Sequence, residues 1–139
     1  MVDQSRITDV LQNAKVIAVV GLSANPRRPS FGVASYLQAQ GYRIIPVNPN
    51  YSNILDEACY ASLLALPKAI KVDIVNIFRR SDAVLPIVEE SIRIGTGTIW
   101  MQEGVVNPEA AKKAERAGVF VVMNRCIMRD HSRYVQKPS

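Results

Sequence analysis

The sequence predicts an α/β fold with one doubly wound parallel sheet of about five strands and helices on both faces. Short runs of apolar and β-branched residues alternate with longer segments whose apolar residues recur at helical spacing. Continuous apolar runs are typical of strands covered on both faces of a parallel sheet, and short connections favour right-handed crossovers. The expected strands are 16–20, 43–47, 72–78, 98–101 and 119–122.

Length and composition indicate a single domain. The chain has 139 residues, of which 48% are hydrophobic and 21% charged, close to ordinary globular usage. We expect 1–139 to form one domain, with an N-terminal helix within 1–15 and a polar C-terminal tail at 127–139. The net charge of +5 favours anionic partners such as nucleotides. A basic surface with no specific anion remains an alternative.

The first half of the chain contains two predicted helices. Apolar residues recur at helical spacing within 1–15, where Asp3 or Ser5 can cap the N-terminus. After the strand at 16–20, a second helix is expected between a cap at Ser30 and the stop signal Gly41. The strand 43–47 then leads into a turn at 48–50. The segment 51–71 has a weaker pattern, with a short strand near Ile54 and a short helix over 61–66.

The second half of the chain repeats the alternation twice. The strand 72–78 precedes a helix that is capped at Ser81 or Asp82 and stops at Gly95. The strand 98–101 precedes a helix that Asn107 caps and Gly118 ends. The last strand is 119–122.

Ligands of doubly wound sheets bind outside the carboxyl ends of the strands, where the strand order reverses. The loop 21–30 is the main candidate because Gly21 permits close backbone approach and the helix behind it presents free N–H groups. Ser23, Asn25 and Ser30 add neutral donors, and Arg27 or Arg28 can bind phosphate oxygens. In the alternative interpretation, these residues only cap the helix and complete a surface loop.

The loop lacks the full dinucleotide fingerprint because Ser23 and Pro26 replace two of its glycines. Asn48 stands where an NAD-binding protein would place an acid, so a dinucleotide is disfavoured. Phe78, Arg79 and Arg80 follow the third main strand and can meet phosphates or stack on a base. Trp100 and the residues up to Gly104 lie at the exit of the next strand, where they offer a ring, a polar pair and a flexible glycine. Core packing remains an alternative for both aromatic residues.

The cysteines and the histidine do not form a recognisable site in the sequence. Cys59, Cys126 and His131 lack the spacing of a structural metal site, and no apolar run is long enough to span a membrane. We therefore expect a cytoplasmic protein with reduced thiols and no metal. A nucleophilic Cys126 assisted by His131 is left open.

Five motifs together resemble a known family. They are VIAVVGLSANPRRPSFGVASYL, GYRIIPVNPNY, VDIVNIFRR, IWMQEGVVNPEAA and NRC, which fall between about Ile7 and Tyr134. The sequence resembles the small bacterial and archaeal CoA-binding proteins, whose domain is similar to the CoA-binding domain of the succinyl-CoA synthetase α subunit.

The resemblance implies a Rossmann-like domain that binds coenzyme A or an acyl-CoA. The glycine loop would meet the phosphates, the second and third strand exits would flank the nucleotide, and the fourth would line the path of the pantetheine arm. The expected cofactor-binding residues are Gly21, Leu22, Ser23, Asn25, Arg27, Ser30, Val47, Asn48, Pro49, Asn50, Phe78, Arg79, Arg80, Met101, Gln102, Glu103 and Gly104.

The sequence departs from the synthetase in ways that disfavour ligase activity. In the synthetase the catalytic histidine and the ATP-binding machinery belong to further domains and a partner subunit. We expect a binding protein without catalytic residues, as a monomer or small homo-oligomer, with an unidentified protein partner left open. Two alternatives remain: an enzyme that uses Cys126 in redox or CoA-thiol chemistry, and an NAD(P)- or nucleotide-sensing regulator. No DNA-binding unit is recognisable, so nucleic acid is not an expected partner.

Overall fold

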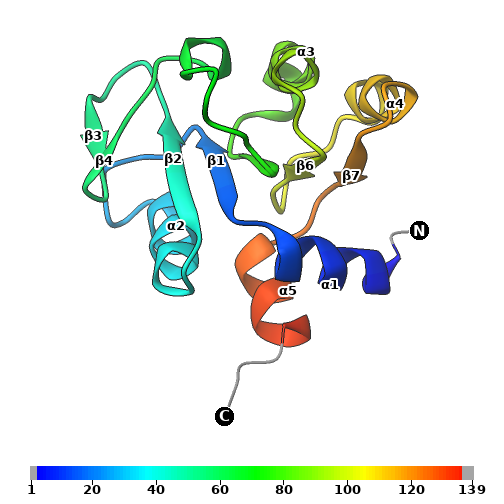
Figure 1. Cartoon of the computed structure of the whole chain (residues 1–139), viewed down its shortest axis with the longest axis horizontal. Coiled ribbons are helices and arrows are strands. Elements are labelled where there is room, and N and C mark those ends of the chain that lie inside the picture. The colour runs from blue at the N-terminus through cyan, green and yellow to red at the C-terminus, as the bar shows by residue number, and fades with distance from the viewer. Residues whose placement is uncertain (1–2, 136–139) are drawn as a thin grey trace.

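The computed structural model describes residues 3–135 of the chain. Its main sheet has five parallel strands in the order β2-β1-β5-β6-β7 (Figure 1). The fold class predicted from the sequence is therefore confirmed. The strands are β1 Val16–Val20, β2 Arg43–Val47, β5 Ile74–Ile77, β6 Thr98–Met101 and β7 Phe120–Val122.

Helices cover both faces of this sheet. On one face lie α3, α4 and the short helix η1; on the other lie α1, α2 and α5 (Figure 1). The helices are α1 Gln4–Asn13, α2 Pro29–Ala39, α3 Val84–Ile94, α4 Pro108–Arg116 and α5 Ile127–Tyr134, with 3₁₀ turns η1 Leu63–Ala65 and η2 Ser81–Ala83.

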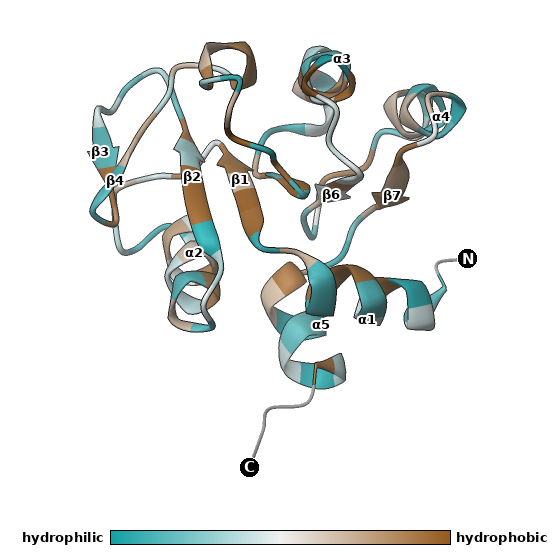
Figure 2. Ribbon diagram, in the orientation of Figure 1, coloured by the Kyte–Doolittle hydropathy of each residue, from teal (hydrophilic) through white to brown (hydrophobic). Residues whose placement is uncertain are grey.

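The strands alternate their buried side chains between two apolar clusters. On β1, Ala18 and Val20 face the cluster under α3 and α4, while Ile17 and Val19 face the cluster under α1, α2 and α5. In Figure 2 the hydrophobic residues, drawn in brown, lie mainly on the strands and on the sides of the helices that face the sheet. The β-branched runs form strands because both of their faces are buried.

A small antiparallel hairpin lies beside β2. Its strands are β3 Asn53–Ile54 and β4 Glu57–Ala58. Tyr60 follows and bridges Val47 at the outer edge of β2. The short strand and short helix expected in this segment are both present, with Leu63–Ala65 as the helical turn.

Strand order reverses between β1 and β5. The chain leaves β1 through α2 to reach β2 on one side, then crosses back to β5 on the other side of β1. This topological switch point places the carboxyl ends of β1 and β5 next to each other. It is the position at which a ligand is expected.

Three details differ from the sequence-based expectations. Helix α2 begins at Pro29 with Arg28 as an N-cap that makes no side-chain bond, so Ser30 is inside the helix and is not its cap. Ser81 lies in the 3₁₀ turn that precedes α3. Residues 127–134 form α5, a helix that the sequence analysis did not predict within the 127–139 tail; residues 136–139 lie outside the described part.

Two predicted caps are confirmed. The Asp3 carboxylate accepts a hydrogen bond from the Ser5 N–H at 3.0 Å at the start of α1. The Asn107 side chain accepts from the Ala110 N–H at 3.0 Å at the start of α4. Within residues 3–135, no helix is long and apolar enough to cross a membrane.

Candidate functional site

The main chains that leave β1 and β5 lie unusually close to each other at the switch point. The Gly21 N–H donates to the Val47 carbonyl at 2.8 Å, and the Phe78 N–H donates to the Val20 carbonyl at 2.8 Å. Gly21 has φ of +87°, and a Cβ built on it would lie 2.2 Å from the Phe78 oxygen. Only glycine meets both requirements, because other residues rarely adopt this φ and all of them carry a Cβ.

The loop that follows Gly21 is shaped by its own side chains. Ser30 Oγ accepts from the Ser23 N–H, Ser23 Oγ accepts from the Asn25 N–H, and Asn25 Oδ1 accepts from the Arg27 N–H, each at 3.0 Å. The neutral residues predicted as ligand donors thus act first as acceptors that fix the loop. The Ser23 hydroxyl keeps its proton and Asn25 keeps its NH₂ group, so these two can still donate to a ligand, whereas Ser30 is 5% exposed and acts only inside the loop.

Four arginines follow the two strands at the switch point. Arg27 and Arg28 are exposed on the loop after β1, and Arg79 and Arg80 are exposed after β5. The Arg79 Cδ atom would lie 3.1 Å from a Cβ on Gly21, so its aliphatic stem runs across the glycine. Arg80 pairs with Asp82 at 3.4 Å, but both side chains are exposed. The guanidinium groups therefore place positive charge on both sides of the switch point.

The β2 exit holds the loops together. Asn48 Nδ2 donates to the Leu22 carbonyl at 3.0 Å, and Asn48 Oδ1 accepts from the Asn50 N–H at 3.0 Å. The Asn48 amide, which the sequence placed where a ribose acid would stand, joins the β1 and β2 loops. Leu22 is fully buried and Val47 is 3% exposed, so these two expected site residues offer mainly backbone atoms.

A cavity of about 340 Å³ lies beside the switch point. Apolar side chains from the ends of β1 and β2 and from α3 form its walls, with Arg79 and Glu90 as charged groups. Glu90 Oε1 accepts from the Leu63 N–H at 3.1 Å, which connects α3 to η1. The sequence analysis missed this wall because η1 and the side of α3 carry no motif. The missed lining residues are Ala61, Ser62, Leu63, Ala83, Pro86, Ile87 and Glu90.

The β6 exit differs from the expectation at Met101. Met101 is fully buried in the core on the α3 and α4 face, so its side chain cannot line an open path in this conformation. Gln102 is 5% exposed and its Oε1 accepts from the Ile127 N–H at 3.3 Å. The Gly104 N–H donates to Asn124 Oδ1 at 2.8 Å. These contacts join the β6 loop to the segment after β7.

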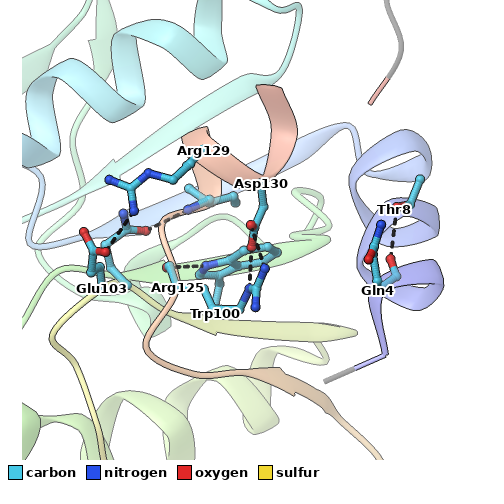
Figure 3. Close-up of polar contacts among 9 residues, drawn as sticks. Gln4, Thr8, Trp100, Glu103, Arg125, Arg129 and Asp130 are labelled. Carbon is cyan, nitrogen blue, oxygen red and sulfur yellow. Dashed lines mark hydrogen bonds and ion pairs between the residues drawn. The ribbon is translucent and has the colours of Figure 1, made fainter. Parts of the chain in front are cut away.

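Two ion pairs attach α5 to this edge of the sheet (Figure 3). Arg129 donates to Glu103 at 2.9 Å, and both side chains are more than half exposed. Arg125 donates two hydrogen bonds to the buried Asp130 carboxylate, from Nε at 2.7 Å and from Nη2 at 2.9 Å. The hydrogen bonds to Asp130 raise the pKa of Arg125. Trp100 Nε1 donates to the Arg125 carbonyl at 2.8 Å.

Cys126 is 8% exposed and forms the N-cap of α5. His131 lies further along the same helix, where its Nδ1 is 2.8 Å from the Tyr36 hydroxyl. That nitrogen is engaged with α2. Burial raises the pKa of the other thiol, Cys59.

The structure thus brings most of the expected residues to one edge but divides their tasks. The exposed or half-buried residues at this edge come from the β1, β2 and β5 exits, whereas several other residues hold the loops in place. The exposed or half-buried ones are Ser23, Asn25, Arg27, Pro49, Asn50, Phe78, Arg79 and Arg80; those buried or bonded to other loops are Leu22, Ser30, Val47, Asn48, Met101, Gln102, Glu103 and Gly104.

Comparison with protein families identifies the chain at this point. The model of the CoA-binding domain matches residues 15–132. The chain belongs to the CoA-binding domain family. The match contains all the strand exits described above, from the Gly21 loop to the start of α5.

The relatives are of two kinds: proteins of similar length, and much longer ligases of which this chain matches only one part. The uncharacterized protein YneT of Bacillus subtilis is 40% identical over 129 residues, which cover 93% of this chain and 94% of that protein. A hypothetical protein from Pyrococcus horikoshii OT3 has a solved structure with a TM-score of 0.92 at 38% identity, covering 97% of this chain and 94% of the other. An ADP-forming acetate–CoA ligase of Archaeoglobus fulgidus is 28% identical over 123 residues, covering 81% of this chain but only 18% of the ligase.

Proposed function

We propose that the protein binds coenzyme A or an acyl-CoA at the carboxyl edge of its sheet, without catalysing a reaction on it. Membership of the CoA-binding domain family supports the choice of ligand. The observation that carries the position of the site is the Gly21–Phe78 contact at the switch point, with exposed arginines on both flanking loops.

The phosphates are assigned to the loop after β1. A pyrophosphate beside Gly21 would face the protons of Ser23 and the amide of Asn25, with Arg27 or Arg28 neutralising its charge. The second pair of arginines, after β5, offers a separate group for the 3′-phosphate. A ligand with phosphates at two places accounts for cations on two loops better than a singly phosphorylated nucleotide does.

An uncharged part of the ligand is assigned to the cavity beside the switch point, because the walls of that cavity are mostly apolar. The apolar cavity beside β1, β2 and α3 can accept an uncharged part of the ligand, with Pro49 and Ile87 as apolar walls. Glu90 also lines this cavity and makes it unfavourable for a phosphate.

Calorimetric titration of the purified protein with CoA, dephospho-CoA, NAD and ATP tests the proposal. We expect CoA to bind most tightly and dephospho-CoA to bind more weakly because it lacks the 3′-phosphate. A charge-assisted hydrogen bond contributes roughly 1.5–3 kcal/mol, so Arg27→Ala should weaken CoA binding about tenfold or more.

A matched control distinguishes a local contact from a loss of net charge. Arg116 is exposed at the end of α4, and Arg116→Ala should leave CoA binding within about a factor of two once ionic strength is near physiological. Preferential binding of NAD, or the absence of CoA binding at millimolar concentration, would reject the proposal.

The burial of Cys126 favours a binding role over a reactive thiol. Reactive cysteines are partly exposed and lie in electropositive surroundings, whereas this side chain packs into the core under α2 and α5. If Cys126 nevertheless reacted with the CoA thiol, an added oxidant such as hydrogen peroxide would take two electrons and join the two thiols in a disulfide; mass spectrometry would then find the CoA adduct in the wild type and not in Cys126→Ser.

A further inference from the structure

The two outer strands of the sheet are protected very differently. The outer edge of β2 carries Pro46, which has no N–H, and is covered by Tyr60, whose N–H donates to the Pro46 carbonyl at 3.0 Å. The Tyr60 carbonyl in turn accepts from the Asn48 N–H at 2.9 Å. The part of this edge around Pro46 is therefore closed to further pairing.

The outer edge of β7 has no such cover among residues 3–135. In the described part of the chain, β7 pairs only with β6. The Phe120 N–H donates to the Gly97 carbonyl at 3.1 Å. Because the N–H and C=O of one residue point to the same side and alternate along a strand, both backbone groups of Val121 point away from β6. The edge is apolar and contains neither proline nor lysine.

A groove of about 680 Å³ is lined by residues of β7, of α4 and of the beginning of α1. Figure 1 shows β7 at the edge of the sheet, next to α4 and near the N-terminal end of α1. Phe120 and Val121 form its floor, and Arg6 lies with its guanidinium carbon 4.2 Å from the centre of the Phe120 ring. Asp3 and Arg6 line it on the α1 side, and Lys112 and Glu115 line it on the α4 side.

The charges of this groove match a second copy of the same chain. Each side carries one acid and one base, so a strand or helix of single charge sign finds no complementary surface there. A two-fold axis normal to the sheet would place α4 beside α4 and α1 beside α1. Lys112 would then face Glu115 of the second copy, and Arg6 would face Asp3 of the second copy, with each pair formed twice.

We propose that the protein forms a symmetric dimer through antiparallel pairing of the two β7 edges around Val121, which joins two five-stranded sheets into one. The backbone groups of Val121 would bond to those of the second copy. The carboxyl edge that carries the Gly21 loop stays outside this interface, so the dimer does not depend on the proposed CoA binding.

Sedimentation velocity over a range of protein concentrations tests this dimer. Val121→Pro removes the outward N–H, changes one partly buried side chain and leaves the ladder to β6 intact; we expect its dimer dissociation constant to rise about tenfold or more. Lys112→Glu should have a similar effect because it sets two acids against each other. The double variant Lys112→Glu with Glu115→Lys restores opposite charges and should recover most of the affinity.

Two controls keep the test decisive. Lys68→Glu changes the net charge equally at an exposed site outside the groove and should leave dimerisation unchanged. Far-ultraviolet circular dichroism establishes that each variant is folded. A wild-type protein that stays monomeric at every concentration, or a dimer indifferent to both Val121→Pro and the charge reversals, would overturn the proposal.

Discussion

The backbone oxygen of Phe78 occupies the space that a side chain on Gly21 would need. An added Cβ would lie 2.2 Å from that oxygen, and the Gly21 φ of +87° is itself unfavourable for other residues. The first two loops of the candidate site therefore meet at a contact between main chains. Their relative position depends on the absence of one side chain.

Gly21→Ala should consequently destabilise the fold and displace the β5 loop. Overpacking of a tight site costs roughly 1–3 kcal/mol, and the strained φ adds about 1 kcal/mol. Gly32→Ala is the matched control, since Gly32 lies in α2 and, among the described residues, no atom beyond its own stretch of helix lies within 4 Å of an added Cβ. It should gain about 0.5–1 kcal/mol from helix propensity. Urea unfolding measures both, and equal effects of the two substitutions would contradict the steric argument.

The sequence predicted those elements whose buried positions are all apolar and follow the regular spacing of a strand or a helix. The run 16–20 is apolar, with β-branched residues at every position except Ala18 and full burial at every position except Val16, and it forms β1 as expected. Helix α5 was missed because its buried face contains Asp130 and His131, which break the apolar period. Its first residue also follows Cys126, which is not a capping residue type.

The site was predictable as a set of loops but not as a set of contacts. Any residue after a parallel strand reaches the carboxyl edge, which local sequence reveals. Whether its side chain faces a ligand depends on partners far along the chain: Asn48 bonds to Leu22, 26 positions away. Met101 could have been recognised as core, since strand alternation places it on the same face as Ile99.

The Arg125–Asp130 pair should anchor the beginning of α5. The Asp130 side chain is 5% exposed and that of Arg125 is 35% exposed, so Arg125→Gln leaves a buried carboxylate without its counter-ion. We expect a loss of about 2–3 kcal/mol, below the usual cost of breaking a fully buried pair because Arg125 is partly hydrated. Arg80→Gln breaks an exposed pair and should cost less than about 0.5 kcal/mol.

Chemical denaturation of both variants, together with the Arg125→Gln/Asp130→Asn double variant, measures this anchor. The double variant removes the buried charge and should regain part of the lost stability. A loss no larger than that of Arg80→Gln would show that the carboxylate finds adequate hydration without Arg125.

Replacement of Asn76 by an apolar residue should stabilise the protein. It is fully buried in β5, and both polar atoms of its side chain are without a hydrogen-bond partner in the described part of the chain. An unpaired buried amide costs about 1–3 kcal/mol, so Asn76→Val should raise the free energy of unfolding by about 1 kcal/mol. Asn107→Ala, in contrast, removes a satisfied cap and should lower it by about 1 kcal/mol. A decrease in both variants under urea would refute the interpretation of Asn76.

Tyr42 should make the protein sensitive to alkaline pH. Its hydroxyl donates to the Leu11 carbonyl in the core, and burial raises the pKa of Tyr42 to about 12. In the unfolded chain the same group titrates near 10. The stabilisation by neutral Tyr42 is therefore complete below pH 10 and is lost as the pH rises to about 12, a total of about 3 kcal/mol.

Tyr42→Phe isolates this contribution because it has no proton to lose. At neutral pH it should be less stable than wild type by about 1 kcal/mol, the value of the lost hydrogen bond. Between pH 10 and 12 its stability should fall less steeply, so the difference from wild type shrinks and then reverses. Tyr51→Phe, at an exposed position, should follow the wild-type profile. Urea unfolding at a series of pH values measures all three proteins, and parallel profiles for wild type and Tyr42→Phe would show that another group carries the alkaline transition.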